Sequence, residues 1–354
     1  MNERNIGIDI LRILLALMVI CIHLIWGDNA LGNSAYTGNL DLFFVPLFAL
    51  CYPAVNTYVL ISGYFSFAKK KTMPFIIKSL FKIWLSLVFA QLLGYGIVLV
   101  THFESFSILE LVKHFFPLTR GIWWYMSVYF VLMLISPALN GVLEQLSKRG
   151  YLIMMVVALF ICSVIPFFTK FESPLGLIRG GGGLLWFIVL YMTGGGIYKY
   201  LLDNPNHKIN GIFALVGYLV LSLILSLSSE LFAKIGMEGY SFYSYNFIIV
   251  YGQAVMLFFA FWQFNIKNYR VSKAISFLAG LSLAAYIYHC QEDIIEHFYQ
   301  YIRPFNYAEG ARLILLFLAF VLGIYLTSTA IEFLRRKLFS IGKLENQILN
   351  IVQR

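Results

Sequence analysis

Long apolar runs separated by short polar connections repeat along the whole chain. A helix needs about 20 apolar residues to cross the hydrocarbon core of a bilayer, and the sequence offers about ten such windows. They cover residues 8–27, 42–65, 78–101, 123–143, 151–168, 184–202, 209–229, 244–264, 274–298 and 311–334. The pattern predicts an all-α, polytopic transmembrane helix bundle of about ten helices.

The composition excludes a soluble protein. Of the 354 residues, 60% are hydrophobic and only 12% are charged, whereas soluble domains are about half apolar and a quarter charged. Aromatic residues make up 18% of the chain, which fits lipid-facing and interfacial positions and argues against disorder or a collagen-like chain. We therefore expect the lipid bilayer to be the main partner of the surface.

The basic residues indicate topology rather than nucleic-acid binding. The net charge is +9, but no basic stripe alternates with stacking aromatics. Of the 26 lysines and arginines, 19 fall on one side of the predicted spans, which the positive-inside rule assigns to the cytoplasm together with both termini. We predict a membrane-embedded domain over residues 1–340 and a short cytoplasmic tail over residues 341–354.

The cysteines and glycines of the chain indicate helix packing rather than a chemical site. The four cysteines have no CxxC spacing, lie within apolar runs, and predict neither a disulfide framework nor a metal cluster. They are Cys21, Cys51, Cys162 and Cys290. The run Gly194 to Gly196 lies within a predicted span and indicates close helix packing.

The first span carries three ionisable side chains, Asp9, Arg12 and His23. Such residues are costly in lipid and by default mark a functional site. Eleven residues bring a helix about 20° past three turns, so Arg12 and His23 share one face about 16 Å apart. Asp9 can partly neutralise Arg12 at i,i+3. Histidine can take up a proton near neutral pH, so we expect a cation at the inner mouth of a cavity and a base at its far end. The alternative is a histidine that bonds a neighbouring helix and an arginine that snorkels to the interface.

The second span carries an asparagine at its middle and a Ser62-Gly63-Tyr64 motif near its end. Asn56 needs a hydrogen-bond partner in lipid and should face the bundle interior. Gly63 by itself indicates a close approach of another backbone.

The fourth span opens with Trp123-Trp124-Tyr125. These aromatics fit either an interfacial belt or a stacking platform for a sugar ring at a cavity mouth.

The ninth span contains Tyr286, His289, Asp293 and His297. Asp293 follows His289 at i,i+4 and can orient its imidazole toward an outer cavity. A divalent metal on His289, Asp293 and His297 is an alternative, but a solvated helix end is commoner, and we predict no metal.

These motifs together resemble the acyltransferase-3 family of integral membrane O-acyltransferases. The specific part is Arg12, ten residues and His23; Ser62-Gly63-Tyr64, the Trp-Trp-Tyr opening of the fourth span and Tyr286-Ile-Tyr-His289 follow in order. The Ala-Val-Asn56 segment before Ile-Ser-Gly-Tyr-Phe is similar to the bacterial branch that modifies surface polysaccharide.

The resemblance implies a function and a location. The co-substrate would be a cytoplasmic acyl-CoA, usually acetyl-CoA, with no tightly bound cofactor. The acceptor would be a hydroxyl of a polysaccharide or lipid-linked glycan at the outer face of a bacterial plasma membrane.

The resemblance also implies roles for single residues. His23 matches the essential histidine, as a general base or covalent acyl carrier. Arg12 matches the essential arginine, which would stabilise a donor phosphate or hold Asp9 and the helix in register. The Ser62-Gly63-Tyr64 motif would serve the donor side. Where many members carry an Arg-x-x-Arg pair, this chain has Lys78 and Lys82, which lack the bidentate arginine fork for donor phosphates.

On the acceptor side we expect Asn56, the Trp123-Trp124-Tyr125 motif and the late segment. That segment contributes Tyr286, His289 and Asp293. A transporter or flippase for a lipid-linked glycan, with Arg12, His23 and His289 along its path, is the alternative function.

Overall fold

The computed structural model describes residues 4–26, 41–101, 106–119, 121–169, 181–202, 210–236, 242–291 and 310–338. All regular structure in these ranges is helical, without a strand, which confirms the all-α prediction. The α-helices are α1 (Ile6–Trp26), α2 (Asp41–Cys51), α3 (Ala54–Ala68), α4 (Met73–Thr101), α5 (Ile108–Lys113), α6 (Trp124–Gln145), α7 (Lys148–Leu159), α8 (Ile165–Thr169), α9 (Leu184–Gly196), α10 (Gly211–Lys234), α11 (Ile248–Trp262), α12 (Tyr269–Ala279), α13 (Ser282–His289) and α15 (Gly310–Leu338). A 3₁₀ turn, η2 (Pro117–Thr119), and two π-helical segments, η3 (Phe160–Val164) and η5 (Ile197–Leu202), complete the set.

The predicted spans correspond to helices in chain order. Nine segments of the described chain are long and apolar enough to cross a membrane, judged by length and composition. The window at 244–264 corresponds instead to α11, an apolar helix of only 15 residues. The polytopic bundle is therefore confirmed, with one helix shorter than a full crossing.

Two of the predicted continuous spans are interrupted. The second span consists of α2 and α3, separated at Tyr52 and Pro53, because proline has no N–H to continue the ladder of helical hydrogen bonds. The ninth begins earlier than predicted, at Tyr269, where the Asn268 side chain accepts from two backbone N–H groups of the first turn. It breaks at Gly280 and Leu281 between α12 and α13.

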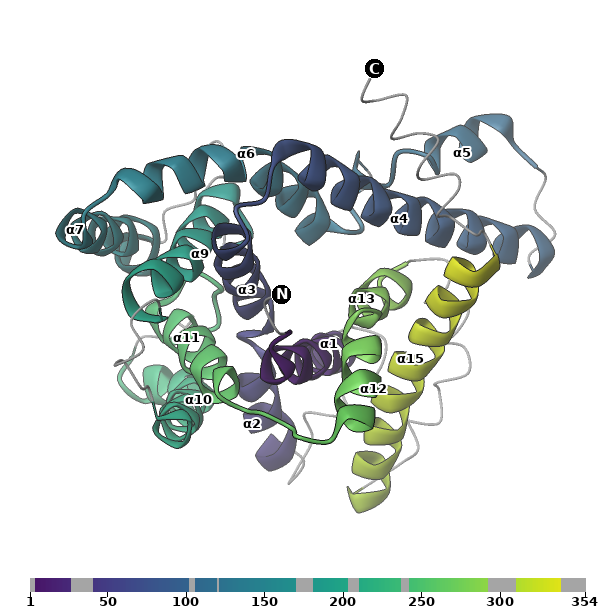
Figure 1. Ribbon diagram of the computed structural model, residues 1–354. Helices are drawn as coiled ribbons and strands as arrows, with labels where there is room; N and C mark the ends of the chain where they lie inside the picture. Colours follow the sequence, from purple (N-terminus) through teal and green to yellow (C-terminus); the bar gives the residue numbers. More distant parts are fainter. Residues whose placement is uncertain are drawn as a thin grey trace.

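Helix α1 lies in the middle of the bundle (Figure 1). It packs against α2, α3 and α11 on one side and against α12, α13 and α15 on the other. Helices α4 and α6 cross the top of this view. Because the first helix touches both halves, its polar side chains can contact residues far away in sequence.

Glycines bring α3 and α9 into backbone contact. A Cβ added at Gly63 would lie 2.1 Å from the carbonyl oxygen of Tyr191, and one at Gly194 would lie 2.1 Å from that of Leu60. Only glycine allows such an approach. The prediction of close packing at Gly194 is confirmed.

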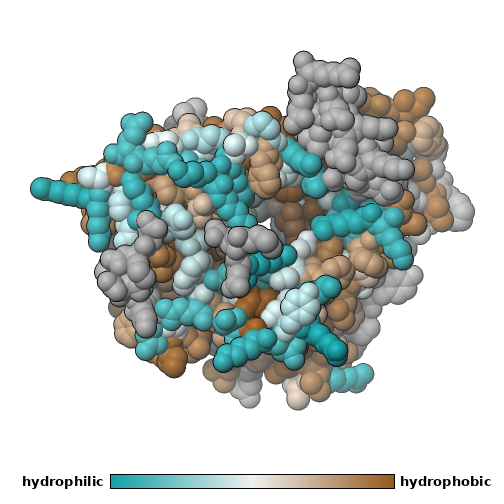
Figure 2. Space-filling view, viewed as in Figure 1, coloured by the Kyte–Doolittle hydropathy of each residue, from teal (hydrophilic) through white to brown (hydrophobic). Residues whose placement is uncertain are grey.

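The outer surface of the bundle is apolar along the helices that the core leaves uncovered. On α15 the exposed leucines repeat every three or four residues, at Leu315, Leu318, Leu322 and Leu326. This spacing places them on one helix face, as expected for a face in contact with lipid. Figure 2 shows hydrophilic residues gathered instead on the end of the bundle that carries the N-terminus, around a hollow near its middle.

Contacts at that end agree with the predicted alternation of the spans. The side chain of Asn5 donates to the carbonyl of Trp262 at the end of α11 (3.0 Å), and Arg4 donates to the carbonyl of Ser276 in α12 (2.8 Å). Lys199, at the end of the sixth span, donates to the carbonyl of Leu143 near the end of α6 (2.8 Å). These helix ends all belong to the side that the basic residues assign to the cytoplasm.

Candidate active site

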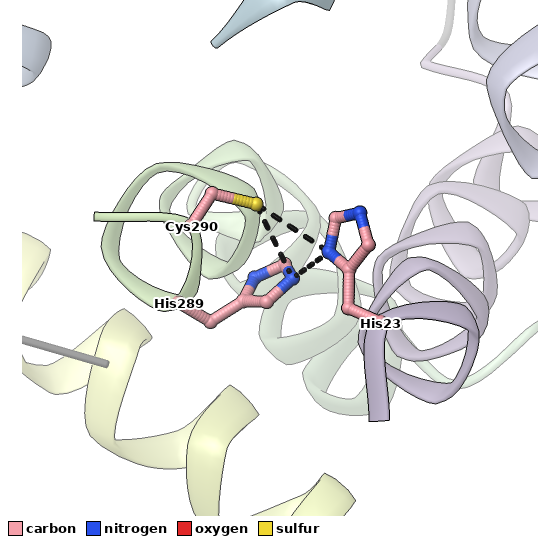
Figure 3. Close-up of side chains that lie close together, drawn as sticks. All are labelled: His23, His289 and Cys290. Atoms are coloured by element: carbon pink, nitrogen blue, oxygen red, sulfur yellow. Dashed lines mark hydrogen bonds between the residues drawn. The ribbon is translucent and has the colours of Figure 1, made fainter. Parts of the chain in front are cut away.

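Two histidines 266 residues apart in sequence face each other in the bundle. His23 lies near the end of α1 and His289 ends α13, and Nδ1 of His23 lies 2.6 Å from Nε2 of His289 (Figure 3). The ring centroids are 4.8 Å apart. On its other side, the Nδ1 of His289 is within hydrogen-bond distance of the Ala285 carbonyl one turn earlier. The two imidazoles thus form a hydrogen-bonded pair.

Cys290 completes this cluster. Its Sγ lies 3.4 Å from Nδ1 of His23 and 3.5 Å from Nε2 of His289. The sequence interpretation of this cysteine as only a small hydrophobe missed the contact. Because it follows the histidine at the end of an interrupted helix, neither spacing nor composition signals the approach to α1.

The cluster has donor atoms suited to a soft metal ion, but its nitrogens are closer together than those of a metal site. One atom each of His23, His289 and Cys290 lies within 4.8 Å of the others. Two nitrogens on a tetrahedral zinc are about 3.3 Å apart, given a bond of about 2.0–2.1 Å. The 2.6 Å separation is that of a hydrogen bond. Asp293 and His297, which the alternative metal set required, lie outside the described residues.

A mostly apolar cavity opens beside His23. Aliphatic groups and five tyrosine and tryptophan side chains line it together with His23, and these five are Tyr58, Trp124, Tyr125, Tyr245 and Tyr286. The hydroxyl of Tyr286 is buried without a hydrogen-bond partner among the described residues. The cavity thus brings His23 together with three of the residues predicted to bind the acceptor.

The other end of α1 carries a buried ion cluster centred on Asp9. Its carboxylate is fully buried and accepts from Arg12 (3.0 Å), from Arg4 (2.5 Å) and from the hydroxyl of Ser276 (2.8 Å). The predicted Asp9–Arg12 pairing is confirmed. The backbone carbonyl of Arg12 accepts from the hydroxyl of Tyr58 (2.8 Å), so the arginine lies directly beside a wall of the His23 cavity.

Lys69 and Lys71, which belong to the basic residues of the predicted cytoplasmic side, extend this cationic end. The Arg12 guanidinium carbon lies 5.2 Å from the centre of the Phe65 ring, and Nζ of Lys69 lies 5.5 Å from the same centre. Burial, together with the charges of Lys69 and Arg12, lowers the pKa of Lys71 to about 8. Arg12, Lys69 and Lys71 together form a cationic cluster. The signal in the sequence was the run Lys69-Lys70-Lys71, which begins five residues after Tyr64.

The two lysines predicted for the donor side lie on the neighbouring helix α4. Lys78 is half-buried and Lys82 is exposed. The backbone carbonyl of Lys82 accepts from Ser86 (3.2 Å). Their contact with donor phosphates stays a prediction.

In the Ser62-Gly63-Tyr64 motif, Ser62 bonds a residue of the cavity wall, whereas Gly63 and Tyr64 pack against other helices. The Ser62 hydroxyl donates to the carbonyl of Tyr58 (2.9 Å) and lies 3.4 Å from the hydroxyl of Tyr129. Gly63 lies against α9, as described above, and the buried Tyr64 packs on Trp262 with 4.7 Å between ring centroids. Any role of Gly63 and Tyr64 on the donor side would therefore be exerted through packing.

Two residues predicted for the acceptor side have partners within the protein. Asn56 is fully buried, donates to the carbonyl of Tyr245 (2.7 Å) and accepts from Nε1 of Trp186 (3.2 Å), which confirms that it faces the interior. Trp123 is fully buried and donates from Nε1 to the carbonyl of Ile287 in α13 (3.1 Å). Of the Trp123-Trp124-Tyr125 motif, Trp124 and Tyr125 line the cavity, and Trp123 anchors the helix that carries His289.

A second buried charge cluster was not foreseen from the sequence. Glu332 in α15 pairs with Arg335 and Arg336, while Ser86 of α4 and Tyr288 of α13 also bond its carboxylate. The signal in the sequence was the position of Glu332 within an apolar helix, three residues before Arg335 and four before Arg336. The cluster joins three helices next to His289.

Comparison with known proteins agrees with this architecture. The acyltransferase-3 family model, described as an acyltransferase domain, matches residues 5–333. No curated protein and no solved structure gives a significant match to the chain. The matched range contains both ends of α1, the aromatic cavity and the His23–His289 pair. The chain therefore belongs to the acyltransferase-3 family and is a multi-pass membrane acyltransferase.

Proposed function

We propose that this acyltransferase moves an acyl group, most simply acetyl, from acyl-CoA at the cytoplasmic end of the bundle to a hydroxyl of a glycan at the outer side of a bacterial plasma membrane. The acceptor would be a surface polysaccharide or its lipid-linked precursor. The observation that carries the proposal is that a histidine in an aromatic cavity and a cationic cluster occupy the two ends of α1. A donor and an acceptor that approach from opposite sides of a membrane require such an arrangement.

The cationic cluster is suited to the phosphates of coenzyme A. Arg12, Lys69 and Lys71 lie close enough to influence one another electrostatically. Like charges held together raise the free energy of the empty site, and a polyanion relieves that repulsion. The Tyr58–Arg12 hydrogen bond joins this site to the cavity, so the pantetheine arm would extend about 16 Å along α1 toward His23.

His23 would act as the general base. Its free ring nitrogen takes the proton of the acceptor hydroxyl as the oxygen attacks the thioester carbonyl. The C–S bond then breaks, and the same nitrogen returns the proton to the coenzyme A thiolate, which gives the O-acyl ester and free coenzyme A. The alternative, in which His23 carries the acyl group covalently, uses the same atom as the nucleophile.

The aromatic side chains of the cavity would bind the acceptor. Trp124 and Tyr125, which line the cavity, are aromatic side chains of the kind on which a sugar ring stacks, and the hydroxyl of Tyr286 has an unused hydrogen bond. An apolar wall with a few polar groups is typical of small-molecule sites.

The test is acyl transfer in membranes that contain the full chain, with labelled acetyl-CoA and a lipid-linked glycan fraction. The proposal predicts labelled ester on the glycan with wild type and none above background with His23→Asn at equal expression. Glycan acetylation that survives in His23→Asn would contradict the assignment of His23. The flippase alternative holds if coenzyme A does not stabilise the purified protein while movement of the glycan across the membrane depends on the presence of this protein.

A further inference from the structure

We infer that His289 is a positioning residue that fixes the tautomer of His23, so that the proton is held on Nδ1 and the basic lone pair stands on Nε2. The inference rests on the proposed function only in taking His23 as the base. It assigns to His289 a role different from contact with the acceptor.

The chain of hydrogen bonds determines where the protons lie. A backbone carbonyl can only accept, so the Ala285 carbonyl requires a proton on Nδ1 of His289. A neutral imidazole carries one proton, so Nε2 of His289 is then an acceptor. The Nδ1 of His23, 2.6 Å away, must donate to it. The lone pair of a neutral His23 is therefore left on Nε2.

The surroundings of the pair support this direction. His23 lines the cavity, whereas His289 and Cys290 are not among the described residues that line it. Figure 3 shows the second ring nitrogen of His23 on the side of the ring away from His289 and Cys290. The Cys290 thiol is a weak partner at 3.4–3.5 Å and packs beside the pair. Ala285 is fully buried in α13. Its carbonyl therefore has a fixed position and orients the series of hydrogen bonds through His289 to His23.

The arrangement also favours the protonated form that forms during transfer. When Nε2 takes up the hydroxyl proton, the bond from Nδ1–H to His289 becomes charge-assisted and stronger. Catalytic triads use a carboxylate behind the histidine for this orientation, and its loss lowers kcat by about 10⁴-fold. Here a neutral imidazole anchored on a backbone carbonyl would supply it.

Two substitutions of His289 separate positioning from packing. In His289→Gln, the side-chain oxygen reaches approximately the place of Nε2 and can still accept from His23. In His289→Asn, the shorter amide reaches only the place of Nδ1, so it keeps the Ala285 contact and loses His23. We expect His289→Asn to lower kcat by about 10²–10⁴-fold with KM for acetyl-CoA little changed, and His289→Gln to stay within about tenfold of wild type.

The tautomer itself gives a readout independent of activity. Nitrogen NMR of the full chain labelled at histidine, with the His23 signals assigned from their absence in His23→Asn, should show Nδ1 protonated and Nε2 unprotonated in wild type. In His289→Asn the proton should shift toward Nε2 of His23. His23→Asn is also the folding control, because its amide can still donate to His289.

Three results would overturn the inference. The first is a proton on Nε2 of His23 in wild type, and the second is an equal loss of kcat in His289→Gln and His289→Asn. The third is one zinc ion per chain in the purified wild type that is absent from purified His289→Asn. If wild type transfers no acyl group at all, the proposed function fails, and the NMR measurement still decides the tautomer.

Discussion

Arg335 holds the carboxylate of Glu332 at two points, with Nε 2.8 Å from Oε2 and Nη2 2.7 Å from Oε1. Both side chains are buried, 6% and 2% exposed, near the end of α15. Arg335 also donates to Ser86 of α4 (2.8 Å), and Tyr288 of α13 donates to Glu332 (3.2 Å). This pair therefore fixes three helices at the residue next to His289.

Glu332→Ala should destabilise the protein strongly, because it leaves the buried Arg335 charge without its partner. The expected cost is about 3–5 kcal/mol, compared with about 0–1 kcal/mol for loss of the half-exposed Arg336 in Arg336→Ala. Thermal unfolding of the purified protein in detergent measures both. Equal losses in the two variants would contradict this account of the cluster.

Gly63→Ala should prevent normal packing of α3 on α9, because the new Cβ would meet the Tyr191 backbone at 2.1 Å. Neither backbone can move without separating the two helices. The matched control is Gly323→Ala in α15, where no atom lies within 4 Å of the added Cβ. The yield of folded protein, measured by size-exclusion chromatography, should fall for Gly63→Ala and stay at the wild-type level for Gly323→Ala. The control variant should gain about 1 kcal/mol from the higher helix propensity of alanine. Normal folding of Gly63→Ala would show that α3 and α9 do not approach this closely.

Acetyl-CoA should bind less tightly as pH rises above about 8. In the free protein the pKa of Lys71 is about 8, and a bound phosphate raises it again by opposing the repulsion of Lys69 and Arg12. Below that pH the lysine is charged in both states and affinity is constant. Above that pH, Lys71 is neutral in the free protein and must take up a proton when acetyl-CoA binds. The Kd then rises by up to about tenfold per pH unit, until the pH reaches the pKa of Lys71 in the complex.

The control is Lys71→Arg, which stays charged throughout this range and should remove the slope while affinity near neutral pH is kept. Titration calorimetry in two buffers of different ionisation enthalpy would count the protons taken up. A wild-type affinity that is flat across pH 8 would place the phosphates away from Lys71.

Asp9→Asn should weaken donor binding although Asp9 itself is fully buried. The neutral amide no longer holds Arg12 and Arg4 as ion pairs, and it disturbs the bond from Ser276 in α12. The loss of hydrogen bonds to a charged group costs about 1.5–3 kcal/mol. We expect KM for acetyl-CoA to rise by about tenfold or more, with a lower melting temperature, in steady-state and unfolding measurements.

Ser276→Ala is the matched control for Asp9→Asn, because it removes one bond and leaves both ion pairs. Its KM should stay close to that of wild type. Equal increases in KM in both variants would mean that Asp9 acts through α12 rather than through Arg12.

Trp124→Ala and Trp123→Ala should fail in different ways. Trp124 lines the cavity, so its loss should raise KM for the glycan acceptor while the fold survives. Trp123 is fully buried against the Ile287 carbonyl, so its loss should lower stability by about 3–5 kcal/mol. Melting temperatures and acceptor kinetics separate the two, and an unchanged acceptor KM in Trp124→Ala would remove it from the acceptor site.

The sequence by itself determined the membrane bundle and the order of its spans, and it singled out α1 as the helix with ionisable side chains. Apolar windows of about 20 residues follow from bilayer thickness, and helical periodicity alone places Asp9, Arg12 and His23 on one helix. The rarity of charge in lipid was enough to single them out.

Only the tertiary structure decided which groups meet. His23 contacts His289 and Cys290 across 266 and 267 residues, and Glu332 contacts Ser86 across 246, because helix packing rather than spacing sets these distances. It also separated Trp123 from Trp124, since neighbours on a helix point in different directions. A single sequence contains the periodicity of each helix but not the rotation of one helix against another, and the chemistry of this site depends on that rotation.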